Sequence, residues 1–175
     1  TRMFGQYVPP ELVEEMSRNP EHYTMEGRNA ELTVLFSDIR GLTSISEGLE
    51  PKQFTQLMND YLGAMTFVIQ DQRGTLDKYI GDAIMAFWAP PFADPANQAR
   101  AACTALLAQR ELLHAFQARV PDIVGLRRDV PRIDFRAALA TGEVVVGSVG
   151  PNNARSFTVI GDAVNFCSRL EATNK

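Results

Sequence analysis

The 175-residue sequence contains no long apolar run and only two cysteines. No stretch of about 18 apolar residues is present, which excludes a transmembrane helix within this sequence. The N-terminus lacks a basic region followed by an apolar core, so no signal peptide is recognised. Cys103 and Cys167 are too few for a disulfide framework or a zinc site, and we expect reduced thiols.

The sequence also has no excess of basic charge. The 17 Lys+Arg against 21 Asp+Glu give a net charge of −4, and the only basic cluster is Arg127-Arg128, which argues against a nucleic-acid surface. Neither a Gly-x-x-x-x-Gly-Lys-Ser/Thr loop nor a Gly-x-Ser-x-Gly elbow is present, which disfavours a P-loop NTPase and an α/β-hydrolase. The 45% hydrophobic and 22% charged content is that of an ordinary globular chain, whose length fits one domain.

Apolar patterning predicts alternating strands and helices. A short apolar run over 32–36 predicts a buried strand that ends near Asp38, and apolar residues spaced by three and four predict a helix from Glu50-Pro51 towards Gly74. Two strands, 75–80 and 83–88, are expected to be joined by a turn at Gly81-Asp82. A short helix is expected to end near Arg18, and a longer helix to run from Asp94-Pro95 to about Arg119, followed by a loop over 120–131. Next we expect a hairpin of strands 133–140 and 144–149 that turns at Thr141-Gly142. A strand over 157–160 and a helix over 163–172, capped by Asp162, complete the expected elements. This order predicts an α+β sandwich with helices on an antiparallel or mixed sheet.

Two acidic residues stand where apolar runs end. If the strands that carry Asp38 and Asp82 are neighbours, they lie about 4.8 Å apart and the two carboxylates converge at one sheet edge. Close carboxylates are unfavourable as a pair unless a proton or a cation lies between them, and oxygen ligands favour Mg²⁺. The alternative is that each carboxylate caps a turn.

The segment after Asp38 has the composition of a phosphate-binding turn. Gly41 relaxes the backbone, and Thr43 or Ser44 can cap a following helix whose free N–H groups bind phosphate oxygens. The alternative is an ordinary strand-to-helix turn.

Together, these segments resemble the catalytic domain of class III nucleotidyl cyclases. The resemblance runs from about Glu31 to Lys175 and implies a ferredoxin-like or palm-type βαββαβ sandwich with an extra hairpin. It assigns residues 1–30 to a connecting segment and 31–175 to the catalytic domain, and it implies further strands beyond Lys175 that carry a triphosphate-binding lysine. The motifs that carry it are Phe36-Ser37-Asp38-Ile39-Arg40-Gly41-Leu42-Thr43, Asp77-Lys78-Tyr79-Ile80-Gly81-Asp82-Ala83-Ile84-Met85-Ala86-Phe87, Thr141-Gly142-Glu143-Val144 with Gly147, and Gly161-Asp162-Ala163-Val164-Asn165 through Arg169-Leu170-Glu171.

The resemblance implies two Mg²⁺ or Mn²⁺ ions per site, held by Asp38, Asp82 and the Ile39 carbonyl. The ions would serve in-line attack of the ribose 3′-hydroxyl on the α-phosphate, which makes the enzyme a phosphorus–oxygen lyase. The phosphate-binding residues would be Arg40, Gly41, Leu42 and Thr43, with Leu42 in place of the usual Phe.

Two polar residues of the last helix resemble the transition-state residues of the family. Asn165 would position the ribose, and Arg169, one turn later, would stabilise charge on the α-phosphate. A permanently charged guanidinium that forks onto phosphate suits this task. Taken without the other motifs, the two residues fit an ordinary exposed helix face.

Base selection would rest on Lys78 and Thr158. Many adenylyl cyclases place Asp where this sequence has Thr158, whereas a bacterial subset carries the Lys/Thr pair and guanylyl cyclases typically carry Glu and Cys. Lys78 can donate to adenine N1 and a threonine hydroxyl can accept from the 6-amino group, so we expect ATP as the substrate.

The resemblance also implies an assembly. The metal ligands of one subunit would face the base-reading and transition-state residues of the other in a head-to-tail homodimer. The segment Phe4 to Met16 would connect a cytoplasmic catalytic domain to an upstream sensor, which in related proteins is often membrane-bound. The alternatives are a guanylyl cyclase, a non-catalytic dimeric signalling module, and a polymerase-like domain, for which no basic groove is evident.

Overall fold

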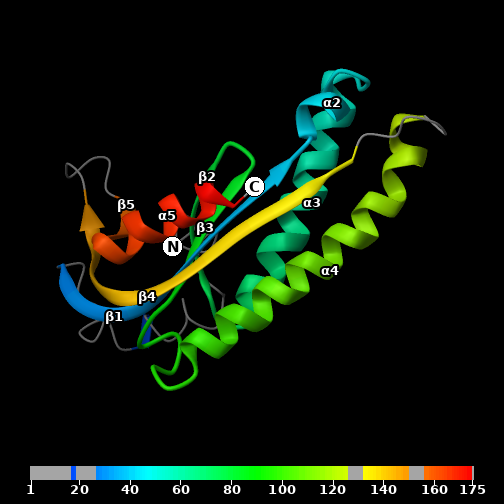
Figure 1. Cartoon of the computed structure of the whole chain (residues 1–175). Helices are drawn as coiled ribbons and strands as arrows, with labels where there is room; N and C mark the ends of the chain where they lie inside the picture. Colours follow the sequence, from blue (N-terminus) through cyan, green and yellow to red (C-terminus); the bar gives the residue numbers. More distant parts are fainter. Residues whose placement is uncertain (1–16, 19–26, 126–131, 150–155, 175) are drawn as a thin grey trace.

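The described residues fold around a five-stranded sheet with strand order β2-β3-β1-β4-β5, in which every neighbouring pair is antiparallel. A computed structural model describes residues 17–18, 27–125, 132–149 and 156–174. In Figure 1 the long strands β1 and β4 run side by side through the middle of the molecule. The strands are β1 (Arg28–Arg40), β2 (Thr75–Ile80), β3 (Ala83–Trp88), β4 (Asp134–Val149) and β5 (Ser156–Ile160).

Helices cover both faces of the sheet. Helices α3 and α4 lie on one face and α5 lies on the other (Figure 1). Because successive strand residues point to opposite faces, Leu35 and Ile39 of β1 join the core under α3 and α4, whereas Val34 and Phe36 join the core that contains Cys167 of α5. The predicted α+β sandwich is confirmed. The helices are α2 (Leu42–Ser46), α3 (Pro51–Asp71), α4 (Gln98–Val124) and α5 (Asp162–Thr173).

The two edge strands of this sheet meet. Strands β2 and β5 are at opposite ends of the strand order, yet the Thr158 hydroxyl of β5 donates to the Asp77 carboxylate of β2 at 2.6 Å. The sheet is therefore curled, so that residues far apart in the strand order share one site.

The predicted hairpin turn at Thr141-Gly142 is wrong, because β4 is a single strand through both residues. Strand β1 pairs with it continuously from Arg40 opposite Asp134 to Arg28 opposite Val146, and the Thr33 and Thr141 hydroxyls hydrogen-bond across the pair at 2.8 Å. Gly142 serves close packing instead, since a Cβ there would lie 3.0 Å from the Ala163 Cβ. The extra hairpin of the fold is formed by β4 and β5.

The helix ends differ from the predictions. Helix α4 begins at Gln98, after a turn in which the Asp94 carboxylate accepts from the Ala96 N–H at 3.1 Å. It continues past Arg119 and through Pro121, because packing of the fully buried Val120 outweighs the hydrogen bond lost at proline. The N-cap of α5 is Gly161, so Asp162 lies in the first turn, where an acidic side chain is favourable.

The segment from Pro51 to Trp88 is confirmed as a helix followed by two strands that meet at the Gly81-Asp82 turn. The expected connecting segment from Phe4 to Met16 lies outside the described residues. Among the described helices, none is long and apolar enough to span a membrane.

Candidate active site

The Asp38 and Asp82 carboxylates lie at the same end of the sheet. Ser37 of β1 pairs with Ile84 of β3, so that Asp38 follows directly after that pair and Asp82 lies in the turn that leads into β3. Burial raises the pKa of Asp82 above its ordinary value, and the negative charge of Asp38 raises it further. The two carboxylates are therefore close enough to repel each other.

An arginine that the sequence reasoning missed contacts Asp38. Arg136 of β4 lies directly opposite Asp38 in the strand pairing and donates from Nη2 to Asp38 Oδ2 at 2.6 Å. Its Nε lies 2.6 Å from Glu171 Oε1 of α5. In the sequence, Arg136 is visible only as a charged residue before the apolar run of β4. The pairing register of β1 and β4 is needed to place Arg136 against Asp38.

Glu171 adds a third acidic group, supplied from the helix. Burial raises the pKa of Glu171 above its ordinary value, while the Arg136 guanidinium lowers it and Asp38 raises it further. The site thus holds three carboxyl groups against one guanidinium, a net negative charge that attracts cations.

The donor chemistry at this end of the sheet fits a divalent cation. Carboxylate oxygens and the backbone carbonyl of Ile39 are hard ligands of the kind that Mg²⁺ and Mn²⁺ take. Within the described ranges, no group of three or more His, Cys, Asp or Glu is placed to hold a metal ion by itself. The remaining coordination positions are left for water and for phosphate oxygens, which is how Mg²⁺ is usually held beside a nucleotide.

A buried tyrosine on α3 lies within range of the charges of the acidic pair. Burial raises the pKa of Tyr61 on α3 well above its ordinary value, with Asp38 and then Asp82 contributing further. Its ring centroid lies 5.5 Å from that of Phe116 on α4. Tyr61 and Phe116 belong to the same buried core as Ile39 of β1 and Ile84 of β3, so the α3–α4 layer packs against the residues next to the acidic pair.

The expected phosphate-binding segment forms a tight turn from β1 into α2. Gly41 has φ +85°, a left-handed conformation, and a Cβ there would collide with the Arg132 carbonyl. Arg40 is exposed at the end of β1, whereas Leu42 is buried in the core. Helix α2 begins at Leu42 and includes Thr43 in its first turn.

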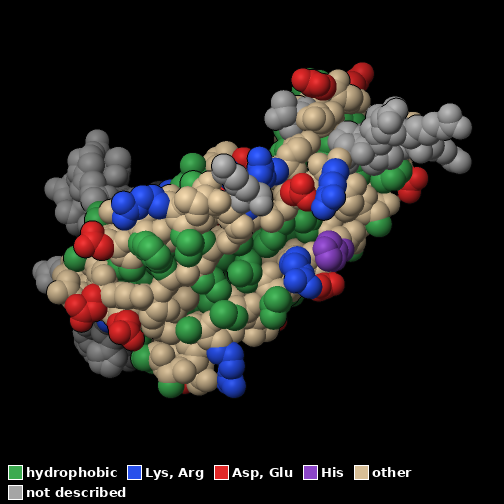
Figure 2. All heavy atoms as spheres, viewed as in Figure 1, with side chains coloured by type: hydrophobic (Ala, Val, Ile, Leu, Met, Phe, Trp, Pro, Cys, Tyr) green, Lys and Arg blue, Asp and Glu red, His purple; other side chains and the backbone are tan. Residues whose placement is uncertain are grey.

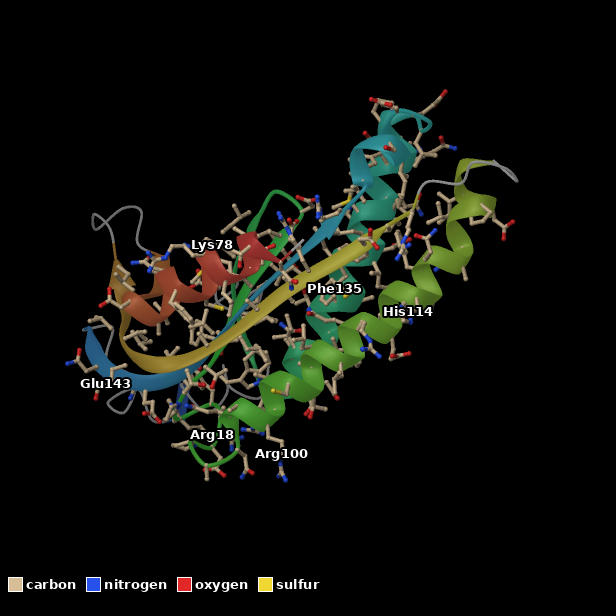
Figure 3. All side chains as sticks on the ribbon, viewed as in Figure 1. Arg18, Lys78, Arg100, His114, Phe135 and Glu143 are labelled. Carbon is tan, nitrogen blue, oxygen red and sulfur yellow. The ribbon has the colours of Figure 1, made fainter. Side chains whose placement is uncertain are left out.

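Lys78 and Thr158 are brought together through a residue that was not predicted. The Thr158 hydroxyl donates to Asp77 Oδ2 at 2.6 Å, and Lys78 Nζ lies 3.3 Å from Asp77 Oδ1. Thr158 is 8% exposed, and the Asp77 side chain is fully buried. Figure 3 shows Lys78 on the α5 side of the sheet, whereas His114 lies on α4 across the sheet.

Asn165 and Arg169 lie four residues apart on α5, on one exposed face of the helix. In the part of the chain that the structure describes, no hydrogen bond or ion pair joins either side chain to Asp38 or Asp82. Phe166 and Leu170, on the same helix, are 55% and 42% exposed. The structure therefore places Asp38 and Asp82 at one end of the sheet and joins Lys78 and Thr158 through Asp77. It leaves Asn165 and Arg169 exposed on α5.

Comparison with known proteins finds relatives that are named adenylate cyclases. The chain is 34% identical over 172 residues to "Adenylate cyclase 1" of Rhizobium meliloti (strain 1021), covering 98% of the chain and 25% of that protein. It is 42% identical over 144 residues to "Adenylate cyclase" of Anabaena cylindrica, covering 82% of the chain and 27% of that protein. The chain thus spans about a quarter of the length of the curated relatives it matches.

The fold matches a solved cyclase structure. The crystal structure of the adenylyl cyclase CyaB from P. aeruginosa superposes with a TM-score of 0.78 at 34% identity, covering 86% of this chain and 75% of that one. The family model described as "Adenylate and Guanylate cyclase catalytic domain" matches residues 25–175. The chain therefore belongs to the adenylate and guanylate cyclase catalytic domain family.

Proposed function

We propose that the chain is the catalytic domain of an adenylyl cyclase, which converts ATP to 3′,5′-cyclic AMP and pyrophosphate. The observation that carries the proposal is the joint placement of Lys78 and Thr158 by the curled sheet. A lysine ammonium donates to the N1 position of adenine, and a threonine hydroxyl accepts from its 6-amino group. The similarity to named adenylate cyclases supports the same substrate.

The acidic end of the sheet would hold the metal ions. Two divalent cations, when bound, would lower the pKa of the ribose 3′-hydroxyl and neutralise charge on the triphosphate. Asp38, Asp82 and the Ile39 carbonyl are the candidate ligands. Arg136 pairs with Asp38 in the structure and would keep that carboxylate neutralised and oriented until a cation arrives.

The nucleotide would be positioned by side chains from two regions. The turn formed by Arg40, Gly41, Leu42 and Thr43 would bind the phosphates, largely through backbone N–H groups. Asn165 would orient the ribose. Arg169 would place a permanent positive charge where negative charge develops on the α-phosphate, which favours the transition state over the ground state.

A homodimer would complete the site. Asn165 and Arg169 face outward on α5, together with the exposed side chains Phe166 and Leu170. Figure 2 shows hydrophobic side chains gathered over α5 and β4 on this face of the molecule. A second copy that covers them would bury apolar surface and bring its own Asp38 and Asp82 towards these residues.

The parent protein would add regulation. Because the chain spans about a quarter of its curated relatives, we also propose that a sensor domain lies elsewhere in the parent protein. Its signal would reach the site by changing how the two subunits face each other.

The direct test measures cyclic nucleotide formation from ATP and from GTP, with Mg²⁺ and then Mn²⁺, across protein concentrations. We expect cyclic AMP from ATP, with a rate that rises faster than linearly with protein concentration because the site needs two subunits. If the protein is folded and dimeric but forms no cyclic nucleotide, the result would favour a signalling module without catalytic activity. Preferential turnover of GTP would instead identify a guanylyl cyclase.

A further inference from the structure

Asp77 contacts both of the proposed base-reading residues, Lys78 and Thr158. None of the described hydrogen bonds joins it to Asp38 or Asp82. Its side chain is fully buried, between the edge strands β2 and β5. One carboxylate oxygen accepts the Thr158 hydroxyl at 2.6 Å, and the other lies 3.3 Å from the Lys78 ammonium. A buried carboxylate is unfavourable without partners, so its presence here calls for a role.

The contact with Asp77 fixes the direction of the Thr158 hydroxyl. A hydroxyl has a single proton to donate and two lone pairs that accept. Because the carboxylate only accepts, the proton of Thr158 points towards Asp77. Any further group that approaches the hydroxyl oxygen meets a lone pair and must be a donor.

This direction distinguishes purines at their 6-position. The 6-amino group of adenine donates to a lone pair, whereas the 6-oxo group of guanine or hypoxanthine would place two acceptors against each other. An unpaired polar group in a buried site costs about 1–3 kcal/mol. A threonine hydroxyl that was free to rotate would accept either base.

The same carboxylate orients the other reader of the base. The ion pair with Asp77 restrains the Lys78 ammonium, while 45% exposure of the Lys78 side chain leaves it accessible to a nucleotide. Asp77 thus sets one donor and one acceptor side by side, the pattern that complements N1 and the 6-amino group of adenine.

We propose that Asp77 is a positioning residue that selects 6-amino purine nucleotides by holding the Thr158 hydroxyl as an acceptor. The inference rests on the proposed function, since it assumes that Lys78 and Thr158 face the base.

The variant Asp77→Asn tests it by reversing the hydrogen bond. The Lys78 ammonium favours the amide oxygen on its own side, which turns the amide NH₂ towards Thr158. The threonine then accepts from the amide and its proton becomes available to a 6-oxo group. We expect the ratio of kcat/KM for ATP to that for inosine triphosphate, which carries a 6-oxo group, to fall about tenfold.

A double-mutant cycle separates positioning from a structural role. In a Thr158→Val background the hydroxyl is absent, so adding Asp77→Asn should leave the ATP-to-inosine-triphosphate ratio unchanged. Thr75→Val is the matched control, because Thr75 is buried on the same strand and its hydroxyl has no hydrogen-bond partner among the described residues. Thr75→Val should change kcat/KM for ATP and for inosine triphosphate by the same factor.

Binding provides a readout that does not need turnover. Affinities for 3′-deoxy-ATP and 3′-deoxy-inosine triphosphate, which lack the attacking hydroxyl, should show the same loss of preference in Asp77→Asn. If that variant does not fold, Asp77→Ser, whose smaller side chain fits the same space and also donates, gives the comparison.

The outcomes are distinguishable. The positioning role would be overturned if Asp77→Asn lowered kcat/KM equally for ATP and for inosine triphosphate. It would also be overturned if Asp77→Asn lowered the ATP-to-inosine-triphosphate ratio just as much in the Thr158→Val background. In either case, cyclic AMP formation by the wild type would still support the cyclase. Absence of ATP turnover and of 3′-deoxy-ATP binding in the wild type would overturn the proposed function itself.

Discussion

Asp82 is held in the fold in an environment that disfavours its charge. Its pKa is raised from the ordinary value of 3.8 by burial and by Asp38. Above the raised pKa the charged carboxylate is therefore less favourable in the folded state than in the unfolded chain, and this penalty disappears below the ordinary pKa. We predict that Asp82→Asn raises the melting temperature at pH 7 in the presence of a chelator, and that the difference vanishes as the pH falls below about 3.8.

Divalent ions provide the control for that prediction. Mn²⁺ should stabilise the wild type at pH 7, since a cation offsets the repulsion between the two carboxylates, and should stabilise Asp82→Asn less. A variant that melts below the wild type in chelator would mean that Asp82 is held by contacts that favour its charge.

Arg136 is expected to stabilise the fold, whereas the charge of Asp82 is expected to destabilise it. It is the cation that contacts both Asp38 and Glu171, whose side chains are 14% and 13% exposed. Removing it leaves two partly buried carboxyl groups without their partner, so Arg136→Ala should lower the free energy of unfolding at pH 7 by about 2 kcal/mol in urea titrations. Arg110→Ala, at an exposed ion pair with Glu111, is the matched control and should change stability little. Equal losses in the two variants would argue against the network.

The predictions at the level of single elements succeeded where the information was local. The apolar face of α3 and the short strand-like runs of β2 and β3 are set by neighbouring residues, and these elements are confirmed. Thr141-Gly142 has the composition of a turn, yet it lies within β4, because thirteen paired residues of β1 extend the strand through it. Long-range pairing of this kind leaves no local pattern in the sequence.

The same distinction applies to the candidate site. The placement of Lys78 with Thr158 was expected from a family resemblance, not from periodicity. Asp77 and Arg136 were missed because their partners come from distant strands, at 81 and 98 residues' separation. What the sequence could not supply was the sheet register and the curl that closes β2 onto β5.

Gly142 provides a test of the continuous strand. A Cβ at this position would lie 3.0 Å from the Ala163 Cβ of α5, tighter than ordinary van der Waals contact. Gly142→Ala should therefore displace α5 and cost about 1–3 kcal/mol of unfolding free energy, with a loss of turnover because α5 carries Asn165 and Arg169.

Gly63 is the matched control for that substitution. It lies in the middle of α3, and a methyl group added there would meet no neighbouring element within 4 Å, so Gly63→Ala should stabilise the protein by up to about 1 kcal/mol. If Gly142→Ala behaves like Gly63→Ala, α5 does not pack on β4 at this point.

At the scale of the whole molecule, one chain would carry both halves of the proposed site but keep them apart. Asp38 and Asp82 lie at one end of the sheet, whereas Asn165 and Arg169 lie on an outward face of α5. In a two-fold symmetric dimer, each site would take its acidic pair from one copy and its α5 residues from the other. Two inactive variants that damage different halves should then repair each other.

We predict that Asp82→Ala and Arg169→Ala each remove most cyclase activity when assayed alone. Mixing them in equal amounts under exchanging conditions yields heterodimers in about half of the population, each with one undamaged and one doubly damaged site. Cyclic AMP formation should therefore recover to about a quarter of the wild-type rate. Light scattering verifies that both variants dimerise, and Asp38→Ala mixed with Asp82→Ala is the control, because both changes fall in the same half and no intact site can form. A mixture of Asp82→Ala and Arg169→Ala that stays inactive although heterodimers form would place both residues in a site within one chain.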